Sequence, residues 1–207
     1  AKAREAAKLT QCLNNERQHV LATNVFAGEH KDRLPFTNWD AGMPVAAFDR
    51  GWLYEATTGG PPNWSLEGGE LYHYIKVDAI WRCPMDDAPD NAPGVRKISS
   101  YVMNGALSSY GADFVYRISD VRGDAVMYWE LDESITNGGS WNDGANWPHE
   151  LEPVTQRHDG GGTVGTVDGS ARHVSQWEWR TQLAFQAPGP LWCDPKYADG
   201  GMATYAP

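Results

Sequence analysis

The chain has 207 residues, of which 41% are hydrophobic and 21% are charged, and its formal net charge is −10. This length fits one ordinary domain with a sizeable core, and the apolar content excludes a disordered chain. The printed sequence holds no stretch of about 18 apolar residues that would span a membrane. The acidic balance argues against nucleic-acid binding, because phosphate contacts need lysine and arginine.

Residues 1–28 are expected to form one helix, because they contain strong helix formers and no proline or glycine before Gly28. Gly28 is suited to end that helix. Glu16 lies largely off the apolar stripe. The stripe recurs at helical spacing, is expected to face the rest of the fold, and comprises Leu9, Cys12, Leu13, Val20, Leu21 and Val25.

Residues 29–97 are expected to form an irregular middle region, interrupted by glycine, proline and asparagine clusters such as TTGGPPNW. Its last part is an acidic loop that carries Asp86, Asp87 and Asp90. Calcium takes six to eight oxygen ligands, often from irregular loops. This loop, or the pair Asp194 and Asp199 near the C-terminus, is therefore a candidate calcium site, although neither has the spacing of an EF-hand.

Residues 98–207 are expected to form an antiparallel sheet followed by C-terminal loops. The segments SSYVMNGAL and GDAVMYWELDE predict strands, and GGTVGTVDGSARHV predicts a hairpin with arms at 163–167 and 171–175. Asp168 and Gly169 are the expected turn, of type I′, since Asp-Gly suits two positive φ angles. A helix followed by strands indicates a single α+β domain over residues 1–207.

The three cysteines are Cys12, Cys83 and Cys193. They form no CxxC pair and have no zinc-finger spacing, which argues against a structural zinc site. Cys83 in WRCPMDD and Cys193 in LWCDP share a similar local sequence, so they are the candidate disulfide. Three buried thiols are the alternative.

Other signatures of catalysis are weak, and we expect no enzyme and no catalytic residue. The glycine run after His158 lacks the lysine of a phosphate-binding loop and leads into a strand. A metal site from His149, Glu152 and His158 has no supporting motif. Acidic pairs such as Asp132 and Glu133 keep a glycoside hydrolase open as a further alternative, but their spacing does not select two catalytic carboxylates.

The ten tryptophans favour either an aromatic core or a carbohydrate-binding surface. Trp141 and Trp147 lie in the glycine- and asparagine-rich segment GGSWNDGANWP, so they are the candidates for stacking on sugar rings. A cell-surface carbohydrate-binding protein, with a polysaccharide as partner, is therefore the alternative function.

One motif is more specific: His158 is followed after nine residues by Asp168 and Gly169, which gives H-x9-D-G. Other motifs occur in a consistent order, namely AREAAKLTQCLNNERQ, VDAIWRCPMD, SSYVMNG, AVMYWELDE and LWCDP. The series covers most of the chain. It resembles the bacterial prepilin-type proteins that carry an H-x9-D-G motif, which are similar to the major pseudopilin of type II secretion and to type IV pilins.

The resemblance implies a long N-terminal helix packed on an antiparallel sheet, and a non-enzymatic subunit that assembles into a filament or pseudopilus. The implied partners are further copies, other pilin-like subunits and the secretion machinery. It gives His158, Asp168 and Gly169 a structural role, with His158 bonding across the loop. It also implies a calcium-stabilised loop, and no other cofactor.

Proteins of this kind begin with a cleaved leader and about 20–25 apolar residues that span the inner membrane. The printed sequence starts inside the expected helix, at Ala1, and lacks that segment. We expect that a preceding segment has been removed. An inner-membrane anchor, with the domain in the periplasm or outside the cell, is thus implied by the resemblance alone.

Overall fold

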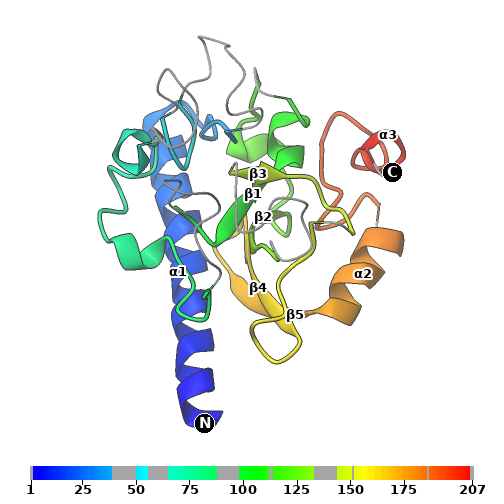
Figure 1. The fold of residues 1–207 in the computed structure, drawn as a ribbon. Helices are drawn as coiled ribbons and strands as arrows, with labels where there is room; N and C mark the ends of the chain where they lie inside the picture. The colour runs from blue at the N-terminus through cyan, green and yellow to red at the C-terminus, as the bar shows by residue number, and fades with distance from the viewer. Residues whose placement is uncertain are drawn as a thin grey trace.

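The computed structural model describes residues 2–38, 50–55, 65–87, 98–111, 114–132, 144–150, 152–185 and 187–205. Helix α1 (Lys2–Glu29) lies along one side of a five-stranded sheet, and helices α2 (Gln176–Phe185) and α3 (Met202–Tyr205) lie on the other side of the molecule (Figure 1). No helix in these ranges is long and apolar enough to cross a membrane. The strands are β1 (Tyr101–Asn104), β2 (Val126–Glu130), β3 (Ala145–Asn146), β4 (Gly161–Thr166) and β5 (Ala171–Ser175).

The sheet has the strand order β3-β1-β2-β4-β5, so the fold is α+β as expected. The expectation of a purely antiparallel sheet is wrong, because β3 pairs with β1 in parallel, with Met103 opposite Ala145. The other neighbours are antiparallel. β3 therefore runs in the same direction as β1 and opposite to β2.

Helix α1 has nearly the expected bounds, but the prediction that the apolar stripe forms its buried face is wrong in part. Leu21 and Val25 are 57% and 44% exposed, whereas Glu16 is fully buried. Asn15 and Thr23 can lie on the inner face because their side chains form hydrogen bonds there. The buried residues of α1 are Cys12, Asn15, Glu16, His19, Val20, Ala22, Thr23, Phe26 and Ala27.

Gly165 in the middle of β4 explains how closely α1 lies on the sheet. A Cβ atom at Gly165 would lie 2.8 Å from Val20 Cγ2 and 3.1 Å from Glu16 Oε2. Gly161, Gly162 and Gly165 all belong to β4. A strand without a side chain at Gly165 lets the helix approach its backbone.

The predicted hairpin is confirmed, and β4 pairs with β5 from Gly161 opposite Ser175 to Gly165 opposite Ala171. Its turn differs from the expectation, because residues 167–170 separate the strands and only Gly169 has a positive φ, of 93°. The turn is therefore not of type I′, which needs two positive φ angles. The Asp168 side chain stabilises the longer loop instead, as described below.

The core is strongly aromatic, which confirms one of the two interpretations of the tryptophans for those that the structure describes as buried. His19 of α1 lies among these rings, 5.0 Å from Trp81 and 5.1 Å from Tyr101 between ring centroids. Burial lowers the pKa of His19 to about 3, so its ring is neutral. The fully buried tryptophans are Trp52, Trp81, Trp129, Trp179 and Trp192.

Candidate functional site

Four side chains from distant parts of the chain meet in the core between α1 and the sheet. Cys12 comes from α1, Cys83 from the loop before β1, Glu130 from the end of β2, and His158 from the loop before β4. All four are buried, and their sulfur, nitrogen and oxygen atoms lie within 4.8 Å of one another. We call these four residues the core polar cluster.

Three short contacts connect the core polar cluster. The sulfur atoms of Cys12 and Cys83 are 2.8 Å apart. His158 Nε2 lies 3.3 Å from Cys83 Sγ and 3.1 Å from Glu130 Oε2. The His158 side chain makes these contacts in the core, with Cys83 and Glu130, and its structural role stays a prediction.

His158 and Glu130 form a buried ion pair. Burial alone would lower the pKa of His158, but its contacts with Cys83 and Glu130 outweigh burial and raise that pKa to about 9. Burial likewise acts to raise the pKa of Glu130, and the hydrogen bond and charge of His158 outweigh it, so the net shift is downward. Arg157 Nη1, 3.5 Å from Glu130 Oε1, adds to this stabilisation of the carboxylate.

The pKa values of two acidic groups, Cys83 and the neighbouring Glu16, are raised. The hydrogen bond with Cys12, followed by burial, raises the pKa of the Cys83 thiol far above its usual range. Burial, followed by the negative charge of Glu130, raises the pKa of Glu16. A neutral thiol is a poor nucleophile, so Cys83 is not activated for nucleophilic attack in the folded chain.

The expected strand SSYVMNG and the acidic loop after Trp81 meet at Ser100. The Ser100 hydroxyl accepts the Cys83 backbone N–H at 2.9 Å and donates to Asp86 Oδ2 at 2.5 Å. Asp86 Oδ1 lies 3.2 Å from Arg157 Nη2, and the Asp86 side chain is fully buried. These bonds hold the loop that carries Cys83 in place beside α1.

The first candidate calcium loop is not assembled as an open site among the described residues. Asp86 is buried against the cation of Arg157, whereas Asp87 is exposed. Asp90 lies outside the described residues. A carboxylate that is already neutralised by an arginine is poorly suited to a calcium ion, and calcium binding stays a prediction.

The second candidate calcium pair uses its oxygens inside the fold. Asp194 Oδ1 accepts hydrogen bonds from the Tyr116 hydroxyl at 2.5 Å and the Lys196 backbone at 2.9 Å. Asp199 accepts the Gly201 N–H at 3.0 Å and the Ala203 N–H at 2.7 Å, and so caps the start of α3. These bonds give both carboxylates a structural role.

Asp168 and Gly169 lie in the turn that follows β4, whereas His158 lies in the loop that precedes it. Asp168 Oδ1 accepts the Thr166 hydroxyl at 2.6 Å and the Ser170 N–H at 3.0 Å, and these bonds lower the pKa of Asp168. The nine residues between His158 and Asp168 therefore consist of a short loop, β4 and one turn residue. The motif anchors one end of a central strand in the core and closes its other end with a turn.

The expected Cys83–Cys193 disulfide needs correction. All three cysteines carry free thiols in the structure, and the sulfur next to Cys83 belongs to Cys12. Cys193 Sγ instead lies 3.6 Å from Asn104 Nδ2. Similar local sequences around Cys83 and Cys193 do not bring them together, because the two loops pack on different parts of the sheet.

The remaining predicted site residues that the structure describes are not members of the core polar cluster. Trp147 is half-buried, and Trp141 lies outside the described residues. His149 and Glu152 are not part of the group of potential metal ligands that includes His158. Asp132 is buried, whereas Glu133 lies outside the described residues.

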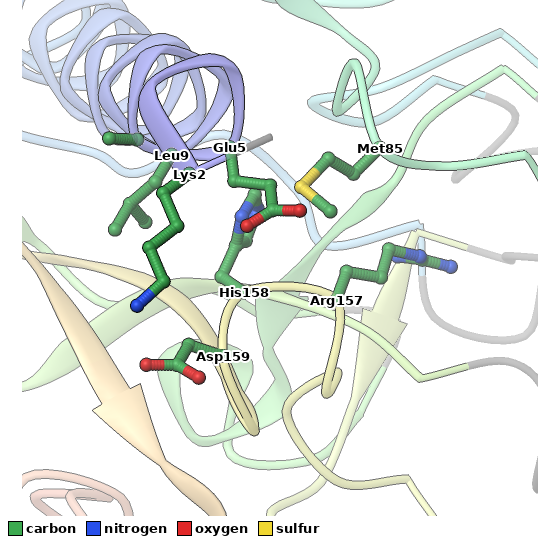
Figure 2. A pocket seen from close by; sticks show the side chains of 8 residues that line it. Lys2, Glu5, Leu9, Met85, Arg157, His158 and Asp159 are labelled. Carbon is green, nitrogen blue, oxygen red and sulfur yellow. The ribbon is translucent and has the colours of Figure 1, made fainter.

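A groove of about 550 Å³ lies above the core polar cluster, between the first turns of α1 and two loops (Figure 2). Lys2 and Glu5 project into it from α1, opposite Met85, Arg157 and Asp159, and the His158 ring lies at its inner side. The groove is lined by charges of both signs. It gives the cluster a nearby polar surface while the two sulfur atoms stay buried.

The residues that the sequence interpretation did not assign to the site are Cys12, Glu16 and Glu130. Cys12 and Glu16 are four residues apart on α1, a spacing that places them on one helix face. That spacing was the available signal: the expected apolar stripe included Cys12 but left Glu16 off it. No protein-family model matches this chain, and no match was found among curated proteins or solved structures.

Proposed function

We propose that this chain is the globular part of a pilin-like structural subunit that assembles into a filament or pseudopilus and is anchored in the inner membrane by a segment preceding α1. The observation that carries the proposal is the placement of α1. Its first turns, at residues 2–7, are exposed and extend past the sheet, whereas its second half packs on β4, β2 and β5 (Figure 1). A subunit that assembles through a helix needs such a free helical end.

The outer face of α1 supports the same function. Leu21 and Val25 lie one helical turn apart and are 57% and 44% exposed, although the opposite face of the helix is already buried. Residues four apart form a continuous ridge on a helix. In a bundle of parallel subunits this apolar ridge would pack on the helix of a neighbouring copy.

The firm attachment of α1 to the domain also fits a subunit that is held in an assembly by its helix. The Asn15 amide donates to the carbonyls of Ala79 and Arg82 and to the Tyr101 hydroxyl, at 3.1–3.3 Å. Closer to the C-terminal end of α1, the hydroxyl oxygens of Thr23 and Tyr128 are 2.8 Å apart. Buried hydrogen bonds of this kind are costly to break.

The proposal is tested by fractionating the source cells with an antibody against this domain. We expect the protein in membranes and in filaments sheared from the surface. In full-length protein, Leu21→Asp together with Val25→Asp should abolish filaments but leave the circular dichroism of the domain unchanged. Gln18→Glu, at an exposed polar position of α1, is the matched control. A native protein that is soluble and monomeric in every fraction contradicts the proposal.

The carbohydrate-binding alternative is favoured by a different observation, the 77% exposure of Trp177 at the start of α2. An exposed indole offers a flat surface for a sugar ring. Titration of tryptophan fluorescence with a panel of polysaccharides tests this function, with Trp177→Ala as the comparison. An unchanged spectrum across the panel excludes it.

A further inference from the structure

The core polar cluster holds two sulfur atoms closer than unbonded sulfurs normally approach, at 2.8 Å. Cys12 is on α1, and Cys83 is on the loop before β1. We infer that Cys12 and Cys83 form a disulfide bond in the mature protein, which links α1 covalently to the sheet. This inference goes beyond filament assembly and does not depend on it.

The backbone around both cysteines is fixed by bonds that do not involve the sulfurs. The Asn15 amide, one turn after Cys12, donates to the carbonyls of Ala79 and Arg82, and Arg82 precedes Cys83 directly. Ser100 holds the Cys83 backbone N–H. The native fold therefore holds the two cysteines side by side through contacts that do not involve a bond between them, and the sulfurs, 2.8 Å apart, need to approach by only about 0.8 Å to reach the disulfide length of about 2.05 Å.

A metal ion is the competing occupant, because two cysteines, one histidine and one glutamate are ligand types that zinc accepts. Two thiolates on one tetrahedral zinc ion lie about 3.8 Å apart, given zinc–sulfur bonds of about 2.3 Å. Zinc binding would therefore require the sulfurs of Cys12 and Cys83 to move apart by about 1 Å. A disulfide needs a smaller movement in the opposite direction.

Charge also favours the disulfide. Zinc with two thiolates and the Glu130 carboxylate would carry a net charge of −1 in a buried site, and the nearby Arg157 is also engaged with Asp86. Buried uncompensated charge is unfavourable. A disulfide introduces no charge, and it leaves the ion pair between His158 and Glu130 in place.

The bond requires an oxidant, and the chemical class is a thiol oxidase that carries a reactive disulfide. One cysteine, as its thiolate, attacks that disulfide and forms a mixed disulfide, and the oxidase releases one thiolate. The second cysteine then attacks the mixed disulfide, which forms the Cys12–Cys83 bond and expels the second oxidase thiolate. Two protons pass from the cysteines to solvent and on to the reduced oxidase, which becomes a dithiol. Cys12 and Cys83 are 0% and 2% exposed in the folded chain, so this exchange takes place before α1 docks.

The test uses the full printed chain, secreted into the periplasm of a bacterial host and purified without reductant. The protein is denatured, alkylated with iodoacetamide, and weighed by mass spectrometry before and after reduction. We expect one label, on Cys193, before reduction and three labels after it. A peptide map should contain a cross-link between Cys12 and Cys83, and Cys193→Ser should change the count before reduction to zero.

Other results would overturn the inference. Three labels before reduction mean that the cysteines are unbonded, and a cross-link that includes Cys193 means that the pairing is wrong. One equivalent of zinc, released by a chelator together with three free thiols, assigns the cluster to a metal. Because the parent chain and Cys193→Ser decide the question, it does not depend on whether variants at Cys12 or Cys83 fold.

Discussion

Glu16 of α1 and Glu130 of β2 lie on either side of one hydroxyl group, and Thr163 Oγ1 is 3.4 Å from a carboxyl oxygen of each. A hydroxyl donates only one proton, so Thr163 cannot satisfy both carboxylates at once. The opposite pKa shifts of the two acids resolve this conflict, since the pKa of Glu16 is raised and that of Glu130 is lowered. The helix therefore packs on the sheet through one neutral and one ionised glutamate.

Replacing Glu16 and Glu130 by glutamine should have opposite effects on stability. Glu16→Gln is expected to raise the free energy of unfolding at pH 8, because glutamine keeps the neutral form without the cost of holding a proton. Glu130→Gln leaves the buried His158 without its carboxylate partner, and should lower that free energy by about 3 kcal/mol or more. Urea unfolding at pH 8 measures both, and effects of equal sign would contradict the assignment.

The pH dependence of Glu16 follows from the sign of its shift. A carboxyl whose pKa is raised in the folded state contributes stability below its unfolded value, near pH 4.5, and loses it as the pH rises toward the folded value. The advantage of Glu16→Gln over the parent chain should therefore be large at pH 8 and nearly vanish at pH 4. Urea unfolding across this range checks the trend.

His158→Gln should destabilise the protein by about 3–5 kcal/mol, the usual cost of removing one member of a buried ion pair. The pKa of His158 is about 9 in the folded protein, against 6.5 for an unperturbed histidine. Its contribution is thus complete below about pH 6.5 and is lost as the pH rises through 9. The parent chain should lose stability over this interval, and the variant should lose less.

Nuclear magnetic resonance of the histidine rings, recorded with the thiols reduced, gives the direct measurement, with a titration midpoint near 9 expected for His158. His73→Gln is the matched control, because His73 is exposed and should leave both stability and the other titrations unchanged. A His158 midpoint at or below 6.5 would refute the ion pair.

Gly165→Ala should push α1 away from β4, because the new Cβ atom would lie 2.8 Å from Val20 Cγ2 and 3.1 Å from Glu16 Oε2. Overpacking of this kind costs about 1–3 kcal/mol. Gly28→Ala provides the control, since it lies within α1 and an added Cβ meets no atom within 4 Å. Thermal unfolding should separate the two, with a lower midpoint for Gly165→Ala alone.

Reduction of the proposed disulfide should lower stability, because the bond joins residues that are 71 positions apart. In the chain-entropy model, a loop of this length corresponds to about 4 kcal/mol. Unfolding with and without dithiothreitol measures the effect. Cys193→Ser should show the same response to reductant as the parent chain, whereas Cys12→Ser should show none.

The sequence was sufficient for the elements that depend on local patterns. Residues 1–28 lack helix breakers and do form α1, and the two arms around Asp168 do form β4 and β5. The buried side of α1 could not be found in this way, because apolar periodicity ranks Leu21 above Glu16, and the hydrogen bond of Glu16 comes from Thr163 on a distant strand.

The candidate site was predicted only in part. His158 was selected through its spacing from Asp168, but its partners Cys83 and Glu130 come from segments far away in the chain. The disulfide expectation failed because it compared local sequences, whereas proximity depends on how α1 crosses the sheet. The two-residue strand β3 carries too little pattern to be recognised, so its parallel pairing was missed.

The position of His158 in the chain also has a consequence for synthesis. The ribosome synthesises Cys12 early and His158 much later. During synthesis, α1 therefore exists before the strands on which it packs, β2, β4 and β5. Its inner face carries Asn15, Glu16 and His19 among smaller apolar residues. A nascent helix with such a face exposes little apolar surface, which lowers the risk that the unfinished chain aggregates before the sheet is complete.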